Sequence, residues 1–478
     1  MPKARLALIL PNAMASRNVV ESPVLAELAG RPGLTVLVLS TRPEDAAAVA
    51  ALGAGNIAWA DLNHPAADPG PLYGGPRLAG RRLLHRLGQR LWGRWAGFGN
   101  LVYRFNEINQ FAGHCQKKAM PPERRARENL AGNFADPALG RPLPMSRPLL
   151  GLLMRLYHCD WCGEPTVEAC LDAWRPTALA VYHVQNLAVR PWLAAARRRR
   201  LPVLGVVGSW DQPTTKGPLP PGLTRIAVQS PRMSAELARW HGVDPAQVAV
   251  TGWPQMDVYC RPGMLRPRAE FLAELGLPAE RNYILFGAYS DRLGPHEPGV
   301  AARIADWLAA GRFGPSASLV IRPHPKDRRW SERFGRLHQP PGGVLLPAEH
   351  GRLDFLANLL HHCGALLCAS GTIALDAIAL DRPVVNLGFD GDLAVDYHAS
   401  VRRWYEMDHY RPVLESGGVA LAESWEQLAA ALATALADPG RDAAGRARCR
   451  AEQLEPLDGQ ASHRLADLMA GFTEGRHD

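Results

Sequence analysis

The segment Leu319–Asp327, with the sequence LVIRPHPKD, carries three basic side chains that could hold a phosphate group. Its apolar start is typical of a buried strand in a parallel sheet, and ligands bind at the carboxyl ends of such strands. Arginine can fork onto a phosphate, and histidine can donate a hydrogen bond to a leaving-group oxygen. Each proline restricts the preceding residue to an extended backbone, which should aim Arg322 and His324 rigidly, with Lys326 beyond them.

The second segment, Leu366–Leu387, places Ser370, Gly371 and Thr372 where a predicted strand gives way to a helix. A helix start presents unpaired N–H groups and a positive dipole end to an anion, and Ser and Thr are good N-caps. Asp376 follows Thr372 at helical spacing, where it either caps the loop or binds a ribose hydroxyl. We expect both segments to lie at adjacent strand ends of one sheet and to form a cradle for a diphosphate or a nucleotide.

The first half of the chain should supply the acceptor site and any general base. The Pro11–Asn18 segment follows the first strand, where a binding loop belongs, and its polar members with the next carboxylate are Arg17, Asn18 and Glu21. Asp211 follows a later strand of the same half. Either carboxylate could deprotonate an acceptor hydroxyl if its pKa is raised, and an ion pair or a helix cap is the alternative role. His183 is a third candidate.

The arrangement of apolar runs predicts the elements that position these residues. The chain has 478 residues, which is too long for one core and favours two domains. Strand-like runs alternate with helical stretches such as Val19–Gly30 and Thr372–Leu380 on both sides of a proline-containing linker, Arg261–Arg268. The expected strands are residues 6–10, 35–39, 57–59, 178–182, 203–207, 226–228 and 248–251 before the linker, and 283–287, 319–321, 343–346, 365–368 and 384–387 after it.

The predicted fold class is therefore α/β, with two facing, doubly wound, Rossmann-like parallel-sheet domains. Residues 1–260 form the acceptor-side domain, with a helical insertion at about 64–160, and residues 269–445 form the nucleotide-binding domain. A charged connection follows the predicted helix at residues 424–437, and a last helix within residues 446–478 is expected to pack back toward the first domain.

Charge and composition narrow the function classes. The formal charge of +8 suggests an anionic partner, such as a lipid headgroup, a nucleotide or a polyanionic glycan. The Arg77–Arg94 stretch could lie on an anionic leaflet or pack on the protein, and Arg197–Arg200 is typical of a solvated helix end. No nucleic-acid motif accompanies the charge. Cys159 and Cys162 form a lone CxxC beside His158, for which free thiols are the favoured interpretation and zinc or redox chemistry the alternative.

Several motifs are missing from the sequence. It contains no GxGxxG fingerprint and no P-loop, which argues against a dinucleotide enzyme or an NTPase. No metal-ligand cluster is evident, so we expect a metal-independent mechanism without a cofactor. Gly287 ends a predicted strand, where a glycine would let the backbone approach a nucleotide. No run of about 18 apolar residues is present, and the amino terminus lacks a signal-peptide pattern, which together favour the cytoplasm.

The pattern RPHP-x-D followed by SGT-x-x-x-D-A-x-x-x-x-x-P resembles the carboxyl-terminal half of GT-B-fold transferases that build bacterial surface polymers. The group includes CDP-glycerol glycerophosphotransferases, capsular Kdo transferases and polysialyltransferases, and non-hydrolysing UDP-N-acetylglucosamine 2-epimerases share the fold. The resemblance implies that His324 binds the donor phosphate and stabilises the leaving group, with Ser370 and Thr372 as a second phosphate contact. Further similar stretches are Ser209–Asp211 with Lys216–Gly217, Val250–Asp257 and Leu457–Arg464.

One difference between this chain and the glycerophosphotransferases bears on the identity of the donor. Glycerophosphotransferases of this group often carry Asp-Tyr-Ser-Ser where this chain has Cys368–Thr372, which favours a nucleotide sugar over a glycerol-phosphate donor. The sequence thus predicts a glycosyltransferase of surface polysaccharide synthesis that uses a glycan or lipid-linked acceptor, in the cytoplasm or on the inner face of the plasma membrane. The alternatives are a 2-epimerase, which would require carboxylates near the sugar from both domains, a glycerophosphotransferase, and a non-catalytic nucleotide- or polyanion-binding protein.

Overall fold

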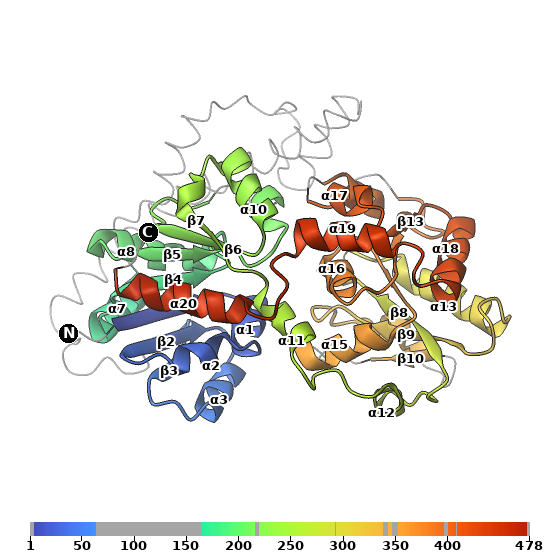
Figure 1. Cartoon of the computed structure of the whole chain (residues 1–478), viewed down its shortest axis with the longest axis horizontal. Helices are drawn as coiled ribbons and strands as arrows, with labels where there is room; N and C mark the ends of the chain where they lie inside the picture. The colour runs from blue at the N-terminus through green and yellow to red at the C-terminus, as the bar shows by residue number, and fades with distance from the viewer. Residues whose placement is uncertain are drawn as a thin grey trace. The chain divides into compact units, whose positions relative to one another are not determined.

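The computed structural model describes residues 4–63, 164–215, 219–291, 293–337, 343–346, 352–395, 400–407 and 409–475. The predicted helical insertion at 64–160, the Arg77–Arg94 stretch and the CxxC pair Cys159 and Cys162 lie outside these residues. Contacts divide the chain into two compact units (Figure 1). The first unit is Met1–Gln255 with Gln460–Asp478, and the second is Met256–Gly459.

The first unit is built on a seven-stranded sheet in the order β3-β2-β1-β4-β5-β6-β7, in which every neighbouring pair is parallel. β4 is a continuous apolar run, and so is β1 after Arg5, because helices cover both faces of a parallel sheet and leave little of a strand in water. The strands are β1 Ala4–Leu10, β2 Leu34–Ser40, β3 Ile57–Asp61, β4 Ala178–Tyr182, β5 Val203–Val206, β6 Arg225–Val228 and β7 Val248–Val250.

The helices of the first unit correct two expectations. The predicted helix over Val19–Gly30 is two helices, because Pro23 separates α1 (Ala13–Val20) from α2 (Val24–Ala29). The predicted binding loop over Pro11–Asn18 is wrong for most of its length, since α1 begins at Ala13. The other helices among the described residues of this unit are α3 Glu44–Ala51, α7 Pro165–Trp174, α8 Arg190–Arg199, α9 Gln212–Thr215, α10 Pro231–Glu236 and α20 Ala461–Thr473.

The carboxyl-terminal helix α20 belongs to the core of the first unit. It packs against α2, β1 and β4 and is drawn in red in Figure 1. Leu465, Met469 and Phe472 of α20 are buried in one cluster with the apolar side chains of β1 and β2. Their spacing of three and four residues places all three side chains on one face of the helix.

The second unit contains a six-stranded sheet in the order β10-β9-β8-β11-β12-β13, again with every neighbouring pair parallel. The strands are β8 Asn282–Gly287, β9 Ala317–Arg322, β10 Gly343–Leu345, β11 Ala365–Cys368, β12 Val384–Leu387 and β13 Ala420–Ala422. The helices are α11 Asp257–Cys260, α12 Arg268–Glu274, α13 Glu297–Ala309, α14 Trp330–Phe334, α15 Leu353–His362, α16 Thr372–Ala379, α17 Arg411–Glu415, α18 Trp425–Ala437 and α19 Ala443–Gln453.

The strand β13 and the helix α19 of this unit were not expected from the sequence, and neither were the short helices α11, α12, α14 and α17. The edge strand β13 is only three residues long, too short for a periodic signal. The predicted charged connection after residue 437 contains the helix α19, whose arginine-rich sequence hides a buried face that includes Arg446 and Cys449. Arg446 is buried because its guanidinium donates to the Asp381 carboxylate at 2.7 Å and to the Pro439 carbonyl at 2.8 Å.

The two sheets share one topology, and it indicates where a ligand would bind. In each, the first strand of the unit lies centrally and the chain winds outward from it in both directions. The strand order therefore reverses between β1 and β4 in the first sheet and between β8 and β11 in the second. Ligands of doubly wound sheets bind outside the carboxyl ends of the strands at this switch point. The predicted α/β class with two doubly wound parallel sheets is confirmed.

Candidate functional site

Tyr289 and Ser370 meet at the switch point of the second sheet. Tyr289 follows β8 by two residues and Ser370 follows β11 by two residues. The Tyr289 hydroxyl lies 3.2 Å from Oγ of Ser370. A methyl group added to Gly371 would lie 3.7 Å from Cε1 and from the hydroxyl of Tyr289, so the tyrosine ring lies beside this glycine. Ser370 is 6% exposed and is held between the strand end and the ring.

The helix α16 begins directly at this pair. Its N-cap is Gly371, in extended backbone, and within the described chain the cap makes no side-chain hydrogen bond. Ser370 and Thr372 are therefore not the N-cap that the sequence suggested: Ser370 precedes the cap, and Thr372 is the first helical residue. The first N–H groups of α16, with the positive end of its dipole, can therefore bind an anion at this position.

The His324 loop follows β9, whose last residue is Arg322. Nδ1 of His324 accepts the backbone N–H of Lys326 at 3.0 Å. A backbone N–H can only donate, so a neutral His324 ring carries its proton on Nε2. The ring can therefore donate from Nε2, as stabilisation of a leaving group requires. Arg322 is 8% exposed, whereas Lys326 is exposed.

The strand order corrects the predicted cradle. β9 and β11 are not neighbours, because β8 lies between them. Two strand spacings separate the loops of His324 and Ser370, which amounts to about 10 Å between strand axes. The loop after β8, with Tyr289 at its start, occupies the intervening position. The candidate site therefore consists of three consecutive strand ends rather than two.

A buried network, which local sequence patterns do not predict, holds two of these loops together. Arg333 of α14 donates to the backbone carbonyls of Tyr289 (3.0 Å) and Gly294 (2.5 Å). The same guanidinium contacts the carboxylates of Glu297 (3.4 Å) and Asp327. Burial raises the pKa of Glu297 to about 8, and it outweighs the backbone N–H of Tyr289 and the guanidinium of Arg333, which act in the opposite direction. These residues lie too far apart in sequence for spacing to reveal them.

The structure gives packing roles to two predicted binding residues. One carboxylate oxygen of Asp376 accepts the hydroxyl of Tyr259 at 2.8 Å, which joins α11 to α16. At Gly287, an added methyl group would lie 2.9 Å from Cδ1 of Ile373. The missing side chain of Gly287 thus makes room for α16 to pack on the sheet.

The switch point of the first sheet is marked by Asn12 and His183. Asn12 is the N-cap of α1, and its Oδ1 accepts the backbone N–H of Ala15 at 3.0 Å. Its Nδ2 lies 3.1 Å from Nδ1 of His183, the residue after β4. Because the amide nitrogen is the donor, Nδ1 of His183 accepts and the neutral ring carries its proton on Nε2. His183 has a left-handed backbone (φ 52°), which is uncommon for a residue other than glycine.

The other predicted residues of the first unit lie farther along the chain from these strand ends. Arg17 donates to Oδ1 of Asn18 at 3.2 Å, and Asn18 is 1% exposed. Glu21 ends α1, and its carboxylate lies 3.6 Å from Arg42. Asp211, after β5, accepts the hydroxyl of Ser209. The structure thus shows separate partners for the two candidate carboxylates, in keeping with the alternative roles of ion pair and local cap.

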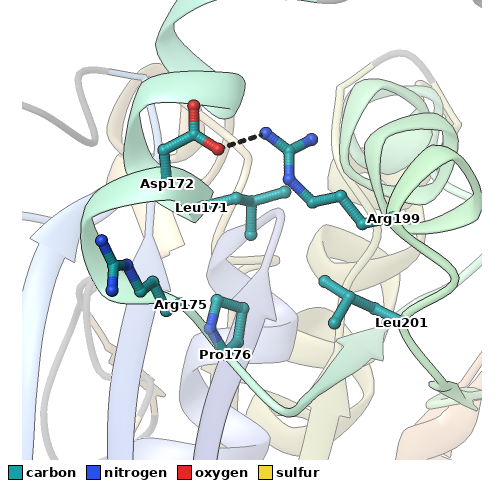
Figure 2. Close-up of a pocket in the computed structure, with 6 residues that line it drawn as sticks. All are labelled: Leu171, Asp172, Arg175, Pro176, Arg199 and Leu201. Carbon is teal, nitrogen blue, oxygen red and sulfur yellow. Dashed lines mark hydrogen bonds and ion pairs between the residues drawn. The ribbon is translucent and has the colours of Figure 1, made fainter.

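Two cavities lie at the opposite, amino-terminal edges of the sheets. One, of about 360 Å³, lies where α7 and α8 end and is lined by Leu171, Asp172, Arg175, Pro176, Arg199 and Leu201 (Figure 2). Arg199 donates to Asp172 at 2.7 Å across it. The other, of about 420 Å³, lies beside the starts of β12 and β13. Neither cavity is lined by a predicted site residue.

The described residues contain no group of three or more His, Cys, Asp or Glu side chains placed to hold a metal ion. None of their helices is both long and apolar enough to cross a membrane.

The comparisons with known proteins bear on the fold. No family model matches the chain, and no curated protein matches it in sequence. Among solved structures, it is similar to a co-structure of S. aureus MnaA with UDP, with a TM-score of 0.56 at 12% identity over 98% of this chain and 97% of that one. It is also similar to a putative UDP-N-acetylglucosamine 2-epimerase from Listeria monocytogenes, with a TM-score of 0.55 at 16% identity over 100% and 98%.

A third similar structure is the UDP-GlcNAc 2-epimerase from Neisseria meningitidis bound to UDP-GlcNAc, with a TM-score of 0.50 at 13% identity over 97% of this chain and 98% of that one. At such low identities the likeness shows the fold alone. The chain has a GT-B-like fold with two parallel α/β sheets of seven and six strands.

Proposed function

We propose that the chain is a glycosyltransferase of surface polysaccharide synthesis, which transfers a sugar from a nucleotide-activated donor to a glycan or lipid-linked acceptor. The observation that carries this proposal is the position of Ser370 and the start of α16 at the switch point of the second sheet. The loop of Arg322, His324 and Lys326 lies at the same sheet edge. This combination is suited to the phosphate of a nucleotide donor.

The proposed chemistry places growing negative charge in the second unit. The acceptor oxygen forms a bond to the anomeric carbon while the bond from that carbon to the phosphate oxygen breaks. The electron pair of the broken bond remains on the phosphate. That charge would be stabilised by Nε2–H of His324, the hydroxyl of Ser370 and the N–H groups of α16. Electrostatic stabilisation of this kind makes the largest contribution to the rate enhancement of many enzymes.

The acceptor proton must pass to a base, and we propose that the first unit supplies it. Glu21 and Asp211 remain candidates from the sequence, although each already has a partner in the structure. His183 is the residue that lies at the switch point itself, beside Asn12. Its acceptor nitrogen Nδ1 is occupied by the Asn12 amide, so as a base it would need to exchange that contact.

Binding followed by turnover tests the proposal. Calorimetry with CMP, CDP, UDP and GDP should identify one nucleotide bound by the full chain, and the matching nucleotide sugars should then be supplied with candidate acceptors. Release of free nucleotide that depends on the acceptor supports a transferase. Tight binding with no turnover of any donor would instead indicate a non-catalytic binding protein. Transfer of glycerol phosphate when CDP-glycerol is supplied in place of a nucleotide sugar would indicate a glycerophosphotransferase.

A 2-epimerase is the second candidate, because the three similar structures described above include two named 2-epimerases, one of them putative. Such an enzyme would convert UDP-N-acetylglucosamine to its 2-epimer with no acceptor and no lasting release of UDP. The carboxylates of Glu297 and Asp327 at the second sheet edge are buried and contact Arg333, which disfavours a direct role for them on a sugar. Proton NMR of the nucleotide sugar distinguishes the two activities.

An association with an anionic membrane surface rests on Arg77–Arg94, which lies outside the described residues, and it remains a proposal. Sedimentation with vesicles that contain anionic lipid tests it, and vesicles of neutral lipid are the control. Binding that is equal for both kinds of vesicle would contradict an electrostatic attachment.

A further inference from the structure

The loop after β8 is anchored at both backbone polar groups of Tyr289, the N–H and the carbonyl. The N–H of Tyr289 donates to both carboxylate oxygens of Glu297, at 3.0 and 2.9 Å. Its carbonyl accepts from Arg333 at 3.0 Å. The Glu297 side chain is fully buried and that of Arg333 is 8% exposed, so water cannot readily replace either partner.

Gly294 shows how closely this anchor is packed. A methyl group on Gly294 would lie 2.3 Å from Oε2 of Glu297, so only glycine leaves room for the carboxylate. The carbonyl of the same glycine accepts from Arg333 at 2.5 Å. Arg333 also reaches Asp327, three residues beyond His324. One guanidinium therefore fixes the β8 loop and the β9 loop against each other.

The side chain of Tyr289 extends from this anchor to the start of α16. Its hydroxyl lies 3.2 Å from Ser370, and its ring lies beside Gly371, the N-cap. Either hydroxyl can be the donor in this pair, because each hydrogen can rotate about its C–O bond. A phosphate bound at the start of α16 would lie beside both hydroxyls, and each can turn its hydrogen toward a phosphate oxygen.

We propose that Tyr289 is a further phosphate-contacting residue of the donor site and that Arg333 is its positioning residue. This inference rests on the proposed function, since it assigns both residues to the phosphate of the nucleotide donor. The hydroxyls of Tyr289 and Ser370 both contact the phosphate. Arg333 fixes the position of Tyr289 by donating a hydrogen bond to its backbone carbonyl.

The first test uses Tyr289→Phe, which removes the hydroxyl and keeps the ring beside Gly371. Calorimetry of the full chain with CMP, CDP, UDP and GDP should show affinity for the best of these lowered about 10-fold or more, as expected for a hydrogen bond to a charged group. Affinity for the corresponding nucleoside, which has no phosphate, should stay unchanged. Equal losses for nucleotide and nucleoside, or no loss for either, would overturn the assignment.

Tyr410→Phe is the matched control. Tyr410 is a buried tyrosine of the same unit, and its hydroxyl donates to Asn386 at 2.7 Å. We expect this variant to have a lower Tm and parental nucleotide affinity. Tyr289→Phe should instead keep the parental Tm and lose nucleotide affinity. If both variants lose affinity together, the loss reflects general destabilisation and contradicts a phosphate contact.

The second test concerns Arg333 and is a double-mutant cycle. Arg333→Lys keeps the charge and loses the fork, and it should weaken nucleotide binding in the parent background. If Arg333 acts through Tyr289, that loss should shrink in the Tyr289→Phe background. If the losses of binding free energy in the two single variants add up to the loss in the double variant, the positioning role of Arg333 is overturned. Should Arg333→Lys not fold, the Tyr289→Phe result alone decides the phosphate contact.

Different results would overturn the proposed donor site and the proposed role of Tyr289. A parent protein that binds none of the four nucleotides would overturn the donor site and Tyr289 with it. A parent that binds a nucleotide, together with a Tyr289→Phe variant of equal affinity, would overturn the role of Tyr289 alone.

Discussion

The side-chain amide of Asn12 lies 3.1 Å from Nδ1 of His183, although 171 positions separate the two residues in the chain. They follow β1 and β4, the strands between which the order of the first sheet reverses. In the second sheet, Tyr289 and Ser370 follow the equivalent strands and also contact each other. Each doubly wound sheet thus carries a side-chain pair across its switch point, where ligands of this fold class bind.

Asn12 should have separable effects on stability and on the His183 position. Asn12→Ala removes the N-cap of α1 and should lower the free energy of unfolding by about 1 kcal/mol. Asn12→Ser can keep the cap but loses the amide that occupies Nδ1 of His183, so it should retain stability and change the rate of turnover. Urea unfolding and initial rates measure the two effects. Parental rates in the serine variant would show that the contact with His183 has no role in turnover.

His324→Ala should reduce turnover by about 100-fold, the usual effect of removing one preorganised donor to a developing anion. Substrate KM should change less, because the donor acts mainly on charge that grows in the transition state. His361→Ala, at a half-buried histidine of α15, serves as the control and should keep the parental rate. An equal reduction of turnover in both variants would point to a general loss of structure.

Glu297 should make stability fall as pH rises through neutrality. The unfolded chain loses this proton near pH 4.5, while in the folded chain burial raises the pKa of Glu297 to about 8. The folded state therefore binds more protons between these values, and the free energy of unfolding falls by about 1 kcal/mol per pH unit as pH rises through that window.

Glu297→Gln mimics the protonated carboxyl and should remove this contribution. Urea unfolding of the parent and the variant at pH 5.5, 6.5 and 7.5 gives the difference in slope, in which all other titrating groups cancel. Identical slopes would mean that Glu297 stays ionised beside Arg333 throughout this range.

Gly208→Ala tests the packing beneath the first switch point. A methyl group there would lie 2.2 Å from Cε1 of Tyr182 and 2.6 Å from Cδ2 of His183. Relief of such overlap typically costs about 1–3 kcal/mol, and it should displace His183 and lower turnover as well. Gly299→Ala is the control, since a methyl group on this α13 glycine has no neighbour within 4 Å. It should be neutral or stabilise the helix by up to about 1 kcal/mol. A Gly208→Ala variant as stable as the parent would contradict the close packing.

Much of the fold followed from local sequence patterns. The strands β4, β11 and β12 begin and end at the residues that the apolar runs predicted. Buried parallel strands give continuous apolar runs, and these are visible without knowledge of the rest of the chain. The binding loop expected over Pro11–Asn18 failed because Asn12 caps a helix that begins one residue later. The polar residue types that favour a helix N-cap also favour a loop, so their presence in the sequence does not distinguish the two.

The candidate site was predictable in its residue types and not in its assembly. Its two predicted loops and the start of α16 follow from proline, serine and glycine chemistry near strand ends. The place of β8 between β9 and β11 does not, and it brings Tyr289 into the site. Arg333 and Glu297 were missed for a related reason. Neither stands in a motif, and they become partners only when two loops fold over one sheet edge.

The amino-acid sequence alone determined most of the strand segments, which strand ends carry basic and hydroxyl side chains, and that the chain folds as α/β, because these properties depend on neighbours within a few residues. Only the tertiary structure decided the strand order, and with it the pairs Asn12–His183 and Tyr289–Ser370 and the Arg333 network. Contacts between distant segments arise from the packing of whole helices on a sheet, which leaves no signature in local spacing.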